Sequence, residues 1–219
     1  MNCILLSLLS TALLSSLTFA QTPTPAPDQT SLPPLIDLVG PPLSGKTSVA
    51  ASISENYKIP VISIEDLISA HADELNQLRG EGVSLTEMRY DPSMSRFLRD
   101  RLKTTDLTHG LILDGFPATL VQAQDLRDIF QGKKMKFIAM RLTLPDDEIR
   151  KRAKTTGRES DNPQILEQRI KDYHREMDWI GSYFPNAKIV DVDANRPEPE
   201  VYKSVQTILA EEGLKPSGK

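Results

Sequence analysis

The sequence predicts an α/β protein with a three-layer α/β/α arrangement, in which a five-stranded parallel sheet lies between two layers of helices. Two observations support this prediction. Five short apolar runs alternate with segments of helical periodicity, and hydrophobic residues make up 39% of the 219 residues. Near-continuous apolar strands that alternate with helices are typical of a parallel sheet covered on both faces. A chain of this length is long enough to bury one core.

The predicted strands are the apolar runs at 35–40, 59–65, 110–115, 136–144 and 187–194. The clearest predicted helices between them are 45–56, 65–78 and 163–184. The second helix places Leu67, Ile68, Ala72, Leu75 and Leu78 on one face. The third begins with Asn162 as a plausible cap and Pro163 in its first turn. Ligands of such sheets bind at the carboxyl ends of the strands.

The N-terminal segment differs from the rest of the chain. Residues 1–20 contain no charged residue, are rich in Leu, Ser and Ala, and end in the small-x-small pattern Thr18-Phe19-Ala20. We therefore expect a secretory signal peptide cleaved after Ala20, and an exported protein, periplasmic or secreted, without stable membrane insertion. The alternative is an uncleaved N-terminal membrane anchor. Residues 21–34 are rich in Pro and Thr, which is typical of an extended linker.

The remaining chain is expected to form one folded domain over 35–214, followed by a disordered tail at 215–219. Its partners are constrained by charge. The net charge is −4 and the pI is about 5.5, which excludes the basic footprint of a nucleic-acid-binding protein. The three histidines and the one cysteine have no metal-ligand spacing.

The strongest local motif is GPPLSGKT, which fits G-x-x-x-x-G-K-[ST] and stands between a predicted strand and a predicted helix. Its glycines let several backbone N–H groups face one phosphate chain, and Lys46 reaches the β and γ phosphates. The hydroxyl of Thr47 or Ser48 is suited to Mg²⁺. The alternative is a chance match in a glycine turn. The predicted phosphate-binding residues are Gly40, Pro41, Pro42, Leu43, Ser44, Gly45, Lys46, Thr47 and Ser48.

A second motif, LDGFPAT, delivers Asp114 to the end of a buried strand. If that strand lies beside the strand of the phosphate loop, the carboxylate is placed to hold the waters of a phosphate-bound Mg²⁺. The alternative is a turn-capping role, because Asp-Gly is a common turn dipeptide.

Five stretches together resemble, in order, the landmarks of adenylate kinase and its nucleoside monophosphate kinase relatives: GPPLSGKT, VISIEDLISA, LILDGFPATLVQAQDL, LPDDEIRKR and GRESDNPQILEQRIKDYH. The resemblance covers about residues 35–212. It implies a P-loop fold with a helical acceptor-binding region and a lid. It also implies ATP and Mg²⁺ as cofactors, a nucleoside monophosphate as acceptor, and a monomer.

The resemblance also assigns roles. Asp114 would hold the magnesium waters, and Gln122 would hydrogen-bond the acceptor base. The implied catalytic residues are Lys46, Arg152, Arg158 and Arg169. The implied acceptor-binding residues are Asp114, Gly115 and Gln122, and the implied metal residues are Thr47 and Asp114. We interpret Arg150 as a solvated helix residue.

The sequence departs from this family on the acceptor side. Two family arginines that bind the acceptor phosphate are replaced by Ser69 and Ala118, and a family threonine by Ile64. Only five residues separate Arg152 from Arg158, so the lid is short, and Thr156 stands nearest to a further lid arginine.

Three hypotheses follow. The chain is an adenylate kinase-like enzyme with weak use of an AMP-like acceptor, a small-molecule kinase whose acceptor lacks a phosphate, or a non-catalytic exported nucleotide-binding module. Under the first hypothesis, the cations that would replace the missing pair are Arg79, Arg89 or Arg96.

Overall fold

The computed structural model describes residues 32–79, 85–156, 162–183 and 188–217. The predicted signal peptide, most of the predicted linker and Arg158 lie outside these residues. The folded unit spans Ser31–Lys219. Within the described ranges, no helix is both long and apolar enough to cross a membrane.

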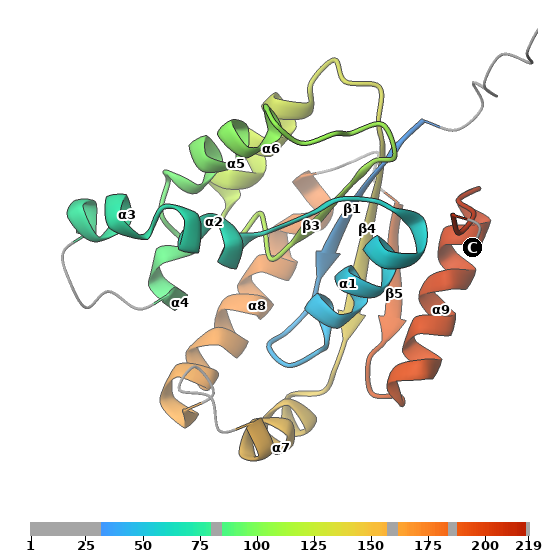
Figure 1. Ribbon diagram of the computed structural model, residues 1–219. Coiled ribbons are helices and arrows are strands. Elements are labelled where there is room, and N and C mark those ends of the chain that lie inside the picture. The colour runs from blue at the N-terminus through green and yellow to red at the C-terminus, as the bar shows by residue number, and fades with distance from the viewer. Residues whose placement is uncertain (1–31, 80–84, 157–161, 184–187, 218–219) are drawn as a thin grey trace, which may run out of the picture. The chain divides into compact units, whose positions relative to one another are not determined.

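The sheet confirms the predicted five parallel strands. They are β1 (Pro34–Val39), β2 (Val61–Ser63), β3 (Leu111–Asp114), β4 (Lys136–Thr143) and β5 (Lys188–Asp193), in the order β2-β3-β1-β4-β5 (Figure 1). In the pairing of β1 with β3, Leu38 stands opposite Asp114. The loop after β1 and the acid that ends β3 are therefore neighbours at one edge of the sheet.

Helices cover both faces of the sheet, which confirms the three layers. Ile36 and Leu38 of β1 pack in a core that includes Ile53 and Leu209, whereas Leu35 packs in a second core on the opposite face. All six residues of β1 are buried, which is why its sequence reads as an apolar run. The helices are α1 (Lys46–Tyr57), α2 (Ile64–Ala70), α3 (Ala72–Arg79), α4 (Leu85–Met88), α5 (Met94–Leu102), α6 (Leu120–Phe130), α7 (Asp146–Thr156), α8 (Pro163–Tyr183) and α9 (Glu198–Glu211).

Two predicted boundaries were wrong. The strand expected at 59–65 ends at Ser63, because the hydroxyl of Ser63 accepts a hydrogen bond from the Asp66 N–H at 3.0 Å and so caps α2. The helix expected at 65–78 is two helices that meet at His71, whose ring stacks on Phe97 with centroids 3.8 Å apart. As a result Leu78, predicted to be on the apolar face, is 60% exposed.

Candidate functional site

The loop between β1 and α1 has the backbone that its motif predicts. A Cβ atom at Gly40 would lie 2.8 Å from the carbonyl oxygen of Leu142, so no larger residue fits there. Gly45 has a φ of 88° just before α1 begins. Leu43 also adopts a left-handed φ, of 62°, which is uncommon for a residue with a side chain. Such strained positions occur at ligand-binding loops.

Lys46 lies inside this loop. Its ammonium donates to the carbonyl oxygens of Gly40 at 2.7 Å and Pro41 at 3.0 Å. The pKa of Lys46 is lowered to about 8, mainly by burial; Asp114 opposes this shift, and Arg89 and Arg169 contribute to it. A buried cation with other cations nearby is stabilised by a bound anion.

Thr47 and Asp114 are in direct contact. The Thr47 hydroxyl donates to Oδ2 of Asp114 at 2.7 Å, and the Asp114 side chain is 2% exposed. Among the described residues, no cluster of three or more His, Cys, Asp or Glu side chains is arranged to hold a metal ion. One hydroxyl and one carboxylate nevertheless fit Mg²⁺, which prefers oxygen ligands and takes most of them from phosphates and water.

A cavity of about 630 Å³ opens beside these residues, and we call it the central cavity. The phosphate loop and the start of α1 form one wall, and Asp114 with Gly115 forms another. Arg169, predicted from the resemblance, lines the central cavity from α8, together with Glu65 and Arg89. The structure therefore brings Lys46, Thr47, Asp114 and Arg169 to one cavity.

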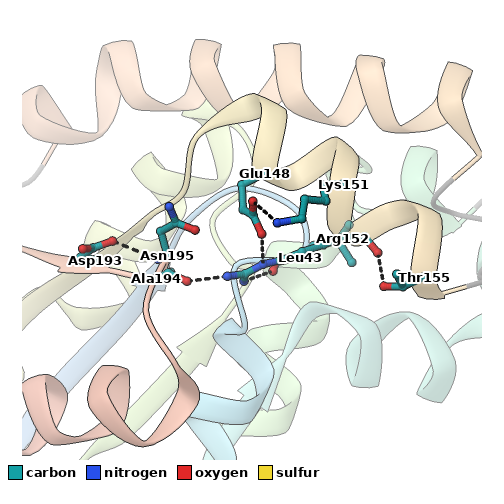
Figure 2. Close-up of polar contacts among 8 residues, drawn as sticks. All are labelled: Leu43, Glu148, Lys151, Arg152, Thr155, Asp193, Ala194 and Asn195. Carbon is teal, nitrogen blue, oxygen red and sulfur yellow. Dashed lines mark hydrogen bonds and ion pairs between the residues drawn. The ribbon is translucent and has the colours of Figure 1, made fainter.

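A second cavity, of about 280 Å³, lies on the other side of the phosphate loop, and we call it the Arg152 cavity. The Arg152 guanidinium donates to the carbonyl oxygens of Leu43 at 3.0 Å and Ala194 at 2.8 Å, as Figure 2 shows. Arg152 thus joins the loop to the turn after β5. Sequence analysis missed the other lining residues from this region, Arg196 and Tyr202. Arg196 follows the carboxyl end of β5, and that position was the available signal, whereas Tyr202 lies within α9.

The positions that the resemblance assigns to the acceptor are arranged differently. The Gln122 amide is fully buried, and its Oε1 accepts from the Ala118 N–H at 2.8 Å. Its Nε2 donates to the carbonyl oxygens of Arg89 at 2.8 Å and Asp91 at 3.3 Å. The resemblance assigns the Gln122 amide to the acceptor base. In this structure that amide is hydrogen-bonded to main-chain groups instead.

The two positions that lack an arginine lie in contrasting environments. Ala118 is 3% exposed and belongs to the core that contains Phe116. Ser69 is exposed on α2, and its hydroxyl donates to the carbonyl oxygen of Glu65 at 2.8 Å. The interpretation of Arg150 as a surface residue is confirmed, because its exposed guanidinium pairs with Glu167.

Two buried acids near the site were not singled out from the sequence. Asp37, in the middle of β1, is 1% exposed, and its Oδ2 has no hydrogen-bond partner among the described residues. Burial, with Glu176 and Asp114 nearby, raises its pKa well above the usual value. Burial also raises the pKa of Glu176 to about 7, against the opposing effects of Arg89 and Lys46. An acid inside an apolar run was the signal for Asp37.

The fold and this site define a class. A parallel sheet, a glycine loop that encloses a lysine, and a threonine that contacts the acid of the neighbouring strand are the features of a P-loop nucleotide-binding protein. The profile of the adenylate kinase family matches residues 38–189.

Individual relatives agree with the profile. The chain is 31% identical over 181 residues to the adenylate kinase of Pseudarthrobacter chlorophenolicus, covering 78% of this chain and 94% of that protein. It is 32% identical over 188 residues to the adenylate kinase of Leifsonia xyli subsp. xyli, covering 82% and 94%. The chain therefore belongs to the adenylate kinase family, and this membership supports a nucleotide kinase function.

Proposed function

We propose that this protein transfers the γ-phosphoryl group of ATP to a nucleoside monophosphate, with AMP as the first acceptor to test. The observation that carries the proposal is the 2.7 Å contact between Thr47 and Asp114 beside the loop-bound Lys46. Phosphoryl transfer depends on positioning and on charge stabilisation, and both require such a phosphate and metal site.

The roles of the donor residues follow from their positions. The backbone N–H groups of the loop and the Lys46 ammonium bind the donor phosphates, with Lys46 exchanging its carbonyl contacts for phosphate oxygens. Thr47 and Asp114 hold Mg²⁺, which when bound neutralises phosphate charge. Arg169, together with Arg158 as the resemblance implies, stabilises the charge that spreads over the transferred group.

We further propose that the base and ribose of ATP occupy the Arg152 cavity. This cavity borders the loop at Ser44 and Ser48, so a nucleoside there leaves its phosphates at Lys46. Tyr202 and Val201 supply apolar surface for a base, and the Arg152 guanidinium lies at the edge. Arg152 then acts on the donor and has no contact with the acceptor.

A second candidate is a kinase whose acceptor carries no phosphate. It is favoured by Glu65, a carboxylate that lines the central cavity, and by the absence of arginine at 69 and 118. Both features disfavour an anion near α2. The same features predict that a nucleoside monophosphate acceptor is used weakly.

Phosphorus NMR of the reaction products separates these functions. With Mg-ATP and AMP, the first proposal predicts ADP from both substrates. Other monophosphates and unphosphorylated nucleosides are tested in parallel, and a no-acceptor sample reports hydrolysis. ATP binding without any product in all samples would identify a nucleotide-binding module and refute both kinase proposals.

Export of the protein remains our proposal from residues 1–20. If the signal peptide is cleaved after Ala20, the mature N-terminus is Gln21. Intact-mass measurement of the protein from its native source tests this, and a retained Met1 would contradict it. We also propose that the mature protein is a monomer, which light scattering during size-exclusion chromatography tests.

A further inference from the structure

The proposed acceptor side of the site lacks arginines at Ser69 and Ala118, and the structure contains another cation in this region. Three arginines in the helical region were candidates to replace the missing pair. Arg96 is half exposed, pairs with Glu74 and lies over the Phe97 ring, 4.5 Å from its centroid. The side chain of Arg79 lies outside the described set. Arg89, at the end of α4, lines the central cavity.

Arg89 is placed directly over the turn that follows β3. Its Nη2 donates to the Gly115 carbonyl oxygen at 3.3 Å, and a Cβ atom at Gly115 would lie 3.6 Å from the same nitrogen. The guanidinium therefore lies in contact with the turn. That turn continues to Ala118, one of the two positions where the family arginine is missing.

Gln122 couples these two positions. Its amide oxygen accepts from the Ala118 N–H, while its amide nitrogen donates to the Arg89 carbonyl oxygen, each at 2.8 Å. One fully buried side chain thus fixes the main chain of Arg89 relative to the turn at Ala118. A long side chain with a fixed main chain loses less entropy when it binds a ligand.

Charges of both signs surround Arg89. Arg89 and Arg169 both lower the pKa of Lys46, after the larger effect of burial, so three cations surround one cavity. The Arg89 Nε is buried and has no partner among the described residues. Acids oppose these cations: Glu65, Asp66 and Asp114 line the same cavity. Glu65 has an oxygen 3.9 Å from the Cβ position of Gly115, and Glu176 lies near Arg89. The planar guanidinium nevertheless retains donors that suit two oxygens of a phosphate.

We propose that Arg89 binds the phosphate of the nucleoside monophosphate acceptor, in place of the arginines missing at Ser69 and Ala118. The inference rests on the proposed function, and it assigns acceptor specificity to a residue of the helical region. Because a single arginine replaces two, the site holds the acceptor phosphate with fewer contacts.

The test compares binding of AMP and adenosine, with the donor site filled by Mg²⁺ and a non-hydrolysable ATP analogue. Arg89→Ala is expected to weaken AMP binding about 10- to 100-fold, the loss of a charge-assisted contact. Adenosine binding and the Kd of the ATP analogue should stay within about twofold, since neither depends on this phosphate. Arg89→Lys keeps the charge, so its affinity for AMP should be intermediate. Arg96→Ala is the matched control, and it should leave the affinities for AMP and adenosine unchanged.

Three outcomes overturn the inference. They are AMP affinity in Arg89→Ala equal to that of the wild type, equal losses for AMP and adenosine, and a wild-type protein that binds no AMP. Turnover separates the inference from the proposed function. If AMP binding depends on Arg89 but no ADP forms, the proposed function fails and the phosphate site stands. If ADP forms and Arg89→Ala leaves the KM for AMP unchanged, the inference fails and the function stands.

Discussion

The two sides of the site differ in how they are built. On the donor side, Lys46 is held by main-chain carbonyl groups, and Thr47 meets Asp114 because two neighbouring strands end together. On the acceptor side, positions 69 and 118 hold Ser69 and Ala118 in place of the arginines that the resemblance implies. The Gln122 amide donates a hydrogen bond to the main-chain carbonyl oxygen of Arg89. The donor side therefore combines backbone geometry with one lysine, whereas the acceptor side depends on individual side chains.

This difference has a physical consequence. A loop whose N–H groups point inward supplies several phosphate donors through its own conformation, and Lys46 adds a charge inside it. An acceptor site made of arginines loses most of its affinity when those arginines change. Nucleotide binding is thus expected to persist in this chain even where acceptor use is weak, and each prediction below tests one side separately.

The largest expected effect is on the donor side. Lys46→Ala should weaken Mg-ATP binding by about two to four powers of ten, if two charged hydrogen bonds of about 1.5–3 kcal/mol each are lost. Transfer should fall below detection. Calorimetry measures binding, and Lys151→Ala, an exposed lysine paired with Glu148, is the control. Unchanged ATP affinity in Lys46→Ala would refute the P-loop interpretation.

The next effect is on the acceptor side. Ser69→Arg places a cation on an exposed position of α2, so it should raise kcat/KM for AMP about 10- to 100-fold and leave ATP binding unchanged. The same substitution should recover part of the AMP affinity that Arg89→Ala loses. Steady-state kinetics with AMP as the varied substrate measures both. A folded Ser69→Arg variant with no gain would show that the acceptor site has diverged beyond this position.

Adding Ala118→Arg tests whether the two positions act on one phosphate. The gain from both substitutions should be smaller than the product of the single gains, because residues that bind one group are not additive. Ala118 is 3% exposed, so an arginine there must extend out of the core, and we expect a lower melting temperature for this variant. Thermal melts accompany the kinetics. Fully multiplicative gains would place the two positions at separate sites.

Much of the donor side was predictable from the sequence, and little of the acceptor side was. The five apolar runs predict the strands. The motif places Thr47 after the carboxyl end of β1, and Asp114 is the last residue of β3, so the two residues are expected to lie close together. The break at His71 was not predictable, because apolar periodicity continues through it. Neither was the contact of Arg89 with Gly115, because the two residues are far apart in the sequence and meet only in the folded chain.

A smaller effect is expected at the Arg152 cavity. Arg152→Ala removes the two hydrogen bonds that join Leu43 to Ala194, so ATP affinity should fall about tenfold, equivalent to roughly 1.4 kcal/mol. The KM for AMP should not change. Arg150→Ala is the matched control on the same helix, because Arg150 is exposed and pairs with Glu167 at the surface. A rise in the KM for AMP in Arg152→Ala would mean that the two sides are not separate.

The smallest expected effect concerns stability and pH, at the boundary between the two sides. The pKa of Glu176 is raised to about 7 in the folded protein, mainly by burial, from an ordinary value of 4.5. Between these two values the folded state binds more protons than the unfolded state. The stability that Glu176 contributes is therefore present below about pH 4.5 and is lost as the pH rises through about 7. The charged groups around this carboxyl are Arg89, Lys46, Asp172 and Arg175, with Asp37 in β1.

Glu176→Gln removes this titration while keeping the shape of the side chain. The melting temperature of the variant relative to the wild type should therefore increase from pH 5 to pH 8, by about 2–4 °C for each kcal/mol of differential stability. The control is Glu167→Gln, because Arg150 lowers the pKa of Glu167 below its ordinary value, so this group does not titrate between pH 5 and pH 8. Parallel pH profiles for wild type and Glu176→Gln would mean that Glu176 stays ionised beside Arg89. The Arg89 guanidinium would then be neutralised by Glu176 before any acceptor phosphate arrives, and weak use of AMP would follow from that ion pair as well as from the missing arginines.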